Sequence, residues 1–171
     1  DSVIQEAGVL TQLSNAGGFD GYINTQVVPM DDGNGYEVYL LAPYRPTWDR
    51  VSQQKAVTHL DGYNLALDVC AALSIARRNG NLYTNLKPES ISVSASGSYH
   101  ICDLGLTSLN YLQYSSLPSA YFSAYTAPEV ADAYSSLNNT MDVYALGMML
   151  YEIFNGGLPF TDRHAEARHC L

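Results

Sequence analysis

One apolar stripe runs along residues 2–14 at helical spacing. Val3, Glu6, Leu10 and Leu13 fall on this stripe, and their spacing of three or four residues predicts a short helix. Glu6 therefore places a carboxylate on an apolar face. Such a group normally needs a cationic partner because an unpaired buried charge is costly. The plain alternative is an exposed acid that the helix dipole favours.

Two longer helices are predicted further along the chain. Residues 61–78 keep one apolar face and end before Gly80, after two arginines that suit the C-terminal end of the helix dipole. Residues 139–154 begin with Asn139 as the expected cap and are apolar nearly all round. A helix of that kind is normally buried, so we expect it in the core.

Short runs of β-branched and aromatic residues predict four strands. Residues 22–30 and 35–44 flank the Asp-Asp-Gly-Asn segment at 31–34, which is typical of a hairpin turn. Two shorter runs follow at 91–93 and 99–102, separated by Ser-Gly-Ser. A length of 171 residues suits one domain with a sizeable core.

Composition and charge exclude several classes of protein. The chain has 8 Lys and Arg against 17 Asp and Glu, a net charge of −9, which argues against binding nucleic acid or anionic membranes, since phosphate contacts need clustered cations. Its three cysteines are odd in number and far apart, so no disulfide framework or zinc ribbon is expected and a reducing cytoplasm is favoured. No segment approaches the ~18 consecutive apolar residues of a membrane helix, and residues 1–20 lack the pattern of a signal peptide.

The most informative segment is YTNLKPES at residues 83–90. It is followed by Asp-Leu-Gly at 103–105, by Ala-Pro-Glu at 127–129 and by Asp-Val-Tyr-Ala-Leu-Gly at 142–147. In order and spacing, these pieces resemble the catalytic loop, metal-binding loop, activation-segment end and central buried helix of the eukaryotic-type (Hanks-type) protein kinase family, most closely its bacterial Ser/Thr members. One piece alone would be a weak signal, but four in order are specific.

The resemblance implies an α+β fold with two lobes. Residues 1–44 would form a partial small lobe, with Glu6 at the position of the family's helix C glutamate, and residues 45–171 would form a mostly helical large lobe. The family's glycine-rich phosphate loop and the lysine that pairs with this glutamate would lie upstream of residue 1. Its last large-lobe helices would follow residue 160, so the chain resembles a fragment of the family domain.

The catalytic loop departs from the family pattern at the positions that perform the chemistry. A kinase needs a carboxylate that accepts the substrate proton and side chains that hold two Mg²⁺ ions. Asn85 stands at the carboxylate position, and a neutral amide cannot take up this proton. Ser90 stands at the second metal position as a shorter, poorer oxygen ligand. Thr84 replaces the arginine that would pair with a phosphorylated activation segment, and Phe122 replaces the usual threonine.

Other positions keep the family residue. Lys87 matches the lysine that contacts the γ-phosphate, and Asp103 matches the Mg²⁺ ligand. The plain alternatives are a solvated loop lysine and a turn aspartate that bonds its own backbone. Asp142 matches the aspartate that holds the catalytic-loop backbone, although a carboxylate near a helix cap is an equally ordinary reading.

The resemblance also places an adenine-binding hinge after residue 40. If Leu41 guards the pocket, the Ala42 carbonyl and the Tyr44 N–H would bond the adenine edge. Pro43, which has no N–H, then falls where no donor is needed. A shift of one residue would put Pro43 at the donor position and weaken adenine binding, so we prefer the first register.

The leading hypothesis is a pseudokinase, a homologue with little or no activity that binds protein partners as a scaffold or allosteric subunit. ATP and Mg²⁺ would bind weakly or not at all, and the tyrosine-rich segment 107–126 is a candidate contact surface. The alternative is an active Ser/Thr kinase in which another group replaces Asn85. A third hypothesis is the kinase-like part of a receptor-like sensor. A cytoplasmic location is expected, either for a free protein or for the cytosolic domain of a longer membrane protein.

Overall fold

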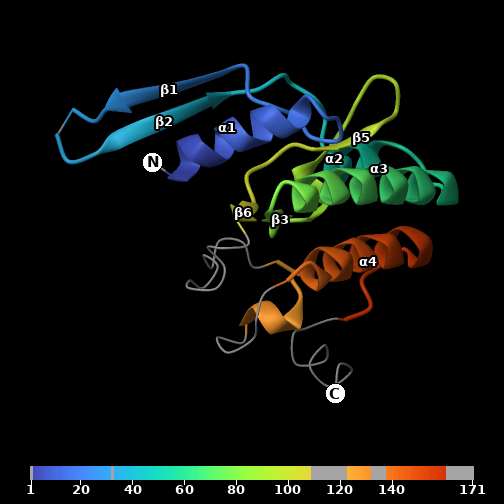
Figure 1. Ribbon diagram of the computed structural model, residues 1–171. Coiled ribbons are helices and arrows are strands. Elements are labelled where there is room, and N and C mark those ends of the chain that lie inside the picture. Colours follow the sequence, from blue (N-terminus) through green and yellow to red (C-terminus); the bar gives the residue numbers. More distant parts are fainter. Residues whose placement is uncertain (1, 32, 109–122, 132–137, 161–171) are drawn as a thin grey trace.

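A helix and a projecting hairpin begin the described part of the chain, and a long helix ends it (Figure 1). The computed structural model describes residues 2–31, 33–108, 123–131 and 138–160. The elements in chain order are α1 (Ser2–Ser14), β1 (Asn24–Pro29), β2 (Tyr36–Leu41), α2 (Trp48–Gln54), α3 (His59–Arg78), β3 (Asn81–Tyr83), the 3₁₀ helix η1 (Pro88–Ser90), β4 (Ile91–Val93), β5 (Tyr99–Ile101), β6 (Leu106–Ser108), the 3₁₀ helix η3 (Pro128–Ala131) and α4 (Thr140–Asn155).

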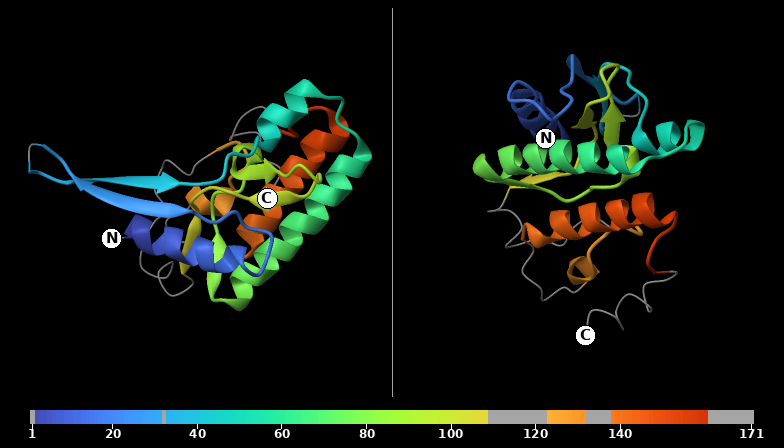
Figure 2. Two further views of the ribbon diagram at one scale, coloured as in Figure 1. Left: turned by 90° about the horizontal axis from the view of Figure 1, so that it is seen from above. Right: turned by 90° about the vertical axis from the view of Figure 1, so that its right-hand side faces the viewer.

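The long helix α3 lies at the centre, with the β4–β5 hairpin on one side and α4 on the other (Figures 1 and 2). The apolar face predicted for it is buried: Leu65, Val69 and Ala72 are at most 1% exposed. Together with Ile101 of β5 and Met149 of α4, they belong to one hydrophobic core. Burial of this stripe therefore joins three layers that are distant in sequence.

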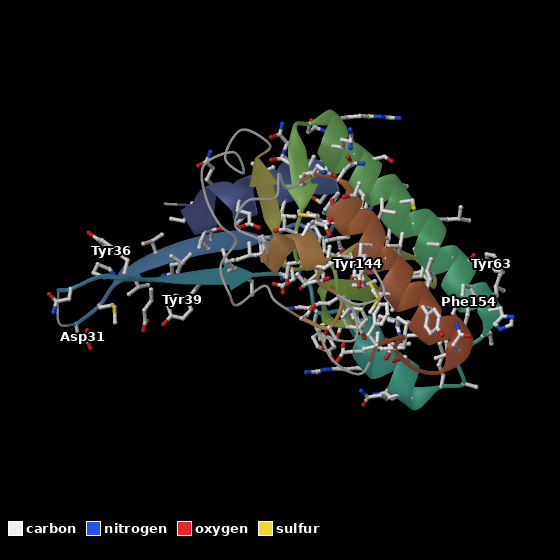
Figure 3. The ribbon with its side chains drawn as sticks, turned by 90° about the horizontal axis from the view of Figure 1, so that it is seen from below. Asp31, Tyr36, Tyr39, Tyr63, Tyr144 and Phe154 are labelled. Atoms are coloured by element: carbon white, nitrogen blue, oxygen red, sulfur yellow. The ribbon has the colours of Figure 1, made fainter. Side chains whose placement is uncertain are left out.

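Close packing between α3 and α4 depends on Gly62. A Cβ atom at this position would lie 2.8 Å from the ring of Phe154, so any larger residue would require this ring to shift. The Phe154 ring also packs against Tyr63, with ring centroids 5.8 Å apart (Figure 3), and against His59, at 5.3 Å. The edge contact with His59 and the tilted contact with Tyr63 help to fix how the two helices lie together.

The sheets are small and antiparallel. In the β1–β2 pair, Asn24 lies opposite Leu41, and in the β4–β5 pair, Ile91 lies opposite Ile101. β3 pairs with β6, which brings two loops of the candidate site side by side. The α+β fold class inferred from the resemblance is confirmed.

The β1–β2 hairpin projects from the body of the molecule (Figure 2). None of its strand residues is buried, and Tyr36 and Tyr39 are 71% and 55% exposed (Figure 3). The inferred division into a small lobe at 1–44 and a large lobe at 45–171 stays a prediction.

The predicted helices are present, with differences at their ends. The first one is confirmed at residues 2–14. α3 begins two residues earlier than predicted because Thr58 and Asp61 form a reciprocal capping box. Asn139 occupies the N-cap position of α4 as predicted, but its side chain makes no capping hydrogen bond. Instead, Asn138 Oδ1 accepts a hydrogen bond of 2.8 Å from the Thr140 N–H.

Helix α4 is not buried on every side. Met141 and Met149 are buried as predicted, but Val143 is 63% exposed, and Tyr151 and Phe154 are also exposed. An apolar composition shows which residues favour burial but not how far the surrounding chain covers them, so the prediction is wrong for this face. Across the described parts of the chain, no helix combines the length and apolar character needed to cross a lipid bilayer.

Among the described elements, the helix α2, the strands β3 and β6, and the two 3₁₀ helices η1 and η3 were not predicted. Each strand has three residues and α2 has seven, which is too short for a clear period. The predicted strands are confirmed, although β1 and β2 are shorter than expected at both ends.

Candidate functional site

The residues 83–90, here called the Asn85 loop, are held in place by buried apolar side chains. Strand β3 leads into the loop, and Tyr83 at its end is fully buried. Leu86 and Pro88 are buried as well. Leu86 and Pro88 alternate in sequence with the polar candidates Asn85 and Lys87. Burial of the apolar side chains fixes the loop backbone and thereby the positions of the two polar residues.

Asp142 on α4 fixes the start of this loop through a hydrogen bond to its backbone. Its carboxylate accepts a hydrogen bond of 3.3 Å from the backbone N–H of Tyr83. Asp142 is 5% exposed, and burial raises its pKa to about 7 although the Tyr83 hydrogen bond acts in the opposite direction. The expectation that Asp142 holds the backbone of the catalytic loop is confirmed.

The residues 103–105, here called the Asp103 loop, lie directly against the Asn85 loop. The Tyr83 hydroxyl donates to the Asp103 carbonyl at 3.1 Å. The backbone N–H and the hydroxyl of Thr84 donate to the Gly105 carbonyl at 2.7 and 3.0 Å. From α1, Glu6 accepts a hydrogen bond from the Gly105 N–H. Tyr83, Thr84 and Glu6, from two separate segments, therefore all contact the Asp103 loop.

Asn85 contacts the same loop through its side-chain amide. The Nδ2 atom donates to the Leu104 carbonyl at 2.8 Å and lies 3.4 Å from Oδ2 of Asp103. Asn85 is only 5% exposed, and its Oδ1 atom is buried without a hydrogen-bond partner. This oxygen is therefore inaccessible to a molecule that approaches from solvent.

Ser90 and Lys87 are joined by two hydrogen bonds within the Asn85 loop. The Ser90 hydroxyl donates to the Lys87 carbonyl at 2.8 Å and accepts from the Lys87 N–H at 3.1 Å. Ser90 is fully buried, whereas Lys87 is half-buried. The roles inferred for Lys87 with phosphate and for Ser90 with metal stay predictions.

The expected hinge follows β2 at the surface. Leu41 is 58% exposed and Tyr44 is 84% exposed, and Ala42 is also exposed. The Leu41 carbonyl accepts a hydrogen bond of 2.7 Å from the Ile23 N–H, so this end of the hairpin is still paired. The adenine contacts inferred for these residues stay predictions.

A second polar cluster surrounds Asp20, and sequence reasoning missed it. Asp20 is 8% exposed and forms an ion pair of 2.7 Å with Arg45. Its Oδ2 atom accepts a hydrogen bond of 2.5 Å from the Ser92 hydroxyl, and His100 Nδ1 lies 3.4 Å from Oδ1, the oxygen that pairs with Arg45. In the sequence, the only signal for this cluster was the charge of Asp20, because the residues that contact Asp20 come from three separate segments.

A small, partly open pocket lies beside the Asn85 loop. It is lined by residues of this loop, of α4 and of the segment 125–127, and it is roughly the size of one water molecule. Both Asn85 and Asp142 line it, and each carries a buried side-chain oxygen without a hydrogen-bond partner. Phe122 and residues 109–122 of the predicted contact segment 107–126 lie outside the described residues.

Residues 3–170 match the sequence pattern of the family described as "Protein kinase domain". The chain belongs to the protein kinase family. The match covers nearly the whole chain, and the Asn85 loop and the Asp103 loop of this kinase domain lie together as the resemblance implied.

Similar kinases occur in fungi and bacteria. The chain is 35% identical to "Protein kinase kin1" of Schizosaccharomyces pombe over 100 residues, 58% of this chain and 11% of that protein. It is 30% identical to "Serine/threonine-protein kinase PknB" of Mycobacterium leprae over 116 residues, 61% of this chain and 18% of that protein. It is 26% identical to "Probable serine/threonine-protein kinase PknB" of Lactococcus lactis over 119 residues, 68% of this chain and 19% of that protein. The kinase domain thus matches less than a fifth of the length of each relative.

Proposed function

We propose that this kinase domain is a pseudokinase, which keeps the kinase scaffold without transferring phosphate. One observation carries the proposal: at the position of the family's proton acceptor stands Asn85, whose amide faces Leu104 and Asp103. A general base must have a free acceptor within hydrogen-bond reach of the substrate hydroxyl. The only oxygen of the Asn85 side chain is buried, and an amide has no basic site at neutral pH.

Without transfer chemistry, the domain would act through its surfaces, as a scaffold or allosteric subunit for protein partners. We place it in the cytoplasm, either as a free protein or as the cytosolic part of a longer membrane protein. Nucleotide binding would use Lys87 for the phosphates, Leu41, Ala42 and Tyr44 for the adenine, and Glu6 for the position of the Asp103 loop.

An active Ser/Thr kinase is the second candidate. It is favoured by the retention of Lys87 and Asp103, both of which are partly accessible to solvent. In that case another group would have to replace Asn85 as proton acceptor, because the Asn85 oxygen is enclosed.

Transfer of radiolabelled γ-phosphate from ATP to a mixture of Ser/Thr peptides separates the two candidates. We expect the wild-type chain to show no transfer above the level of Asp103→Ala, with either Mg²⁺ or Mn²⁺ present. Asn85→Asp restores the family carboxylate, so a gain of transfer in this variant would support the pseudokinase assignment. Wild-type transfer that Asp103→Ala abolishes would overturn it.

Nucleotide binding is a separate question that thermal unfolding with ATP can answer. A ligand at one hundred times its dissociation constant adds about 2.7 kcal/mol to the free energy of unfolding. A rise in the unfolding midpoint with ATP would show a retained nucleotide site. No rise at millimolar ATP would leave a domain that acts through protein contacts alone.

A further inference from the structure

The side-chain amide of Asn85 makes contacts that a carboxylate in its place would not make. Its nitrogen faces two acceptors, the Leu104 carbonyl at 2.8 Å and Oδ2 of Asp103 at 3.4 Å. The two N–H bonds of the amide suit both acceptors, and this chemistry fixes the orientation of the amide. An aspartate at position 85 would instead set its oxygens against a carbonyl and a second carboxylate.

Both oxygens of Asp103 are engaged within the protein. Oδ1 accepts a hydrogen bond of 2.8 Å from the Leu104 N–H, and Oδ2 faces the Asn85 amide. Magnesium requires oxygen ligands at about 2.0–2.1 Å in a near-octahedral arrangement. The N–H dipole of Asn85 directs its positive end at Oδ2, as a bound cation would direct its charge.

The remaining candidate ligands do not complete a metal site. The Ser90 hydroxyl is fully buried and exchanges two hydrogen bonds with the Lys87 backbone. The Glu6 carboxylate is directed at the Gly105 N–H. Within the part of the chain that the structure describes, no group of three or more His, Cys, Asp or Glu side chains is arranged to hold a metal ion. Of the family's metal positions, this leaves the Asp103 carboxylate, and because both of its oxygens already accept hydrogen bonds, the donor set fits Mg²⁺ poorly.

We propose that Asn85 is a positioning residue whose amide takes the place of a divalent cation, fixing Asp103 and its loop so that the site binds no Mg²⁺ or Mn²⁺. The inference deepens the proposed function and rests on it. Its consequence is that a nucleotide bound at this site binds without a divalent cation. Lys87, the cation of the Asn85 loop, would then offset the phosphate charge.

Titration of the full chain with Mn²⁺, followed by the electron paramagnetic resonance signal of the free ion, tests this directly. We expect no bound Mn²⁺ in the wild-type chain. We also expect an unfolding midpoint that MgCl₂ does not raise above the value in NaCl of equal ionic strength. The matched variant Asn85→Asp replaces the N–H donor by a second carboxylate at the same place. It should be less stable without metal and should gain about 4 °C when Mn²⁺ is at ten times its dissociation constant.

Mn²⁺ binding by the wild-type chain that is lost in Asp103→Asn would overturn the inference, and this result does not depend on whether Asn85→Asp folds. An Asn85→Asp chain with wild-type stability and no Mn²⁺ binding would also overturn it. The proposed function fails separately: phosphate transfer by the wild-type chain with Mg²⁺ contradicts both proposals, whereas bound Mn²⁺ without transfer contradicts only this one.

Discussion

Gly105 packs so closely on Asn85 that a Cβ atom at position 105 would lie 2.6 Å from the Cβ of Asn85. The same atom would lie 3.0 Å from the Tyr83 ring. Both neighbours are buried, so neither side chain can move aside into solvent. The Asn85 loop and the Asp103 loop can therefore pack closely because position 105 has no side chain, and their hydrogen bonds add to this contact.

Replacing this glycine tests the match. Gly105→Ala should lower the free energy of unfolding by about 1–3 kcal/mol, because buried atoms must shift to admit one methyl group. Gly147→Ala on α4 is the control, since nothing lies within 4 Å of the added Cβ. It should stabilise the helix by about 0.5–1 kcal/mol. Urea unfolding measures both, and equal effects in the two variants would contradict the close packing.

Asp142 should make the stability of the domain depend on pH. Burial raises its pKa to about 7 from an unfolded value of 3.8, so the folded state binds the proton more tightly. This contribution is fully present below pH 3.8 and is lost as the pH rises through 7, by about 4 kcal/mol at the limit. Asp142→Asn keeps an oxygen for the Tyr83 N–H but does not titrate. Unfolding free energies of the two chains, measured against pH, should diverge over this window; parallel curves would refute the assignment.

The ion pair between Arg45 and Asp20 should be worth more than an ordinary surface pair. Arg45→Ala removes a cation at 2.7 Å from a carboxylate that is 8% exposed. The substitution leaves Asp20 as a buried charge without its cation, so the free energy of unfolding should fall by about 2–4 kcal/mol. The loss is limited because Ser92 still donates a hydrogen bond to Asp20. Arg50→Ala, at an exposed position of α2, is the control and should cost less than about 0.5 kcal/mol. Similar losses in the two variants would show that the buried pair contributes nothing special.

The capping box of α3 should also depend on pH. Burial alone would raise the pKa of Asp61, but hydrogen bonds from Lys55 and Thr58 outweigh it and lower the pKa to about 2. The stability from this lowered pKa is present above pH 3.8 and is lost as the pH falls through 2. At neutral pH, Asp61→Ala should cost about 1–2 kcal/mol.

Lys55→Ala is the matched control for that cap. It removes the ion pair of 2.6 Å, but Lys55 is 45% exposed, so the cost should stay below about 1 kcal/mol. Denaturant unfolding at neutral and low pH compares the two variants. A larger loss for Lys55→Ala than for Asp61→Ala would mean that the ion pair, and not the cap, stabilises the start of α3.

Periodicity and motif spacing predicted the elements with a repeated pattern and the pieces of the site that follow one another in fixed order. The apolar stripe of residues 2–14 predicted α1, and the resemblance to protein kinases implied that Asn85 and Asp103 belong to one site. The reach of Asn85 to the Leu104 carbonyl was not predictable, because it depends on the angle between two loops. The partners of Asp20 come from separate segments and follow no period. Burial of α4 depends on neighbouring chain, which composition does not reveal.

The projecting hairpin has a consequence for how the molecule opens. A two-stranded ribbon without buried residues gains little from packing, so its backbone amides should exchange with deuterium through local opening, well before those of α3 and β5. The expected hinge lies at the end of this ribbon. A ligand that bound between Leu41 and the Asp103 loop would have to restrict the motion of this hairpin. The free energy needed to order the hairpin would lower the observed affinity.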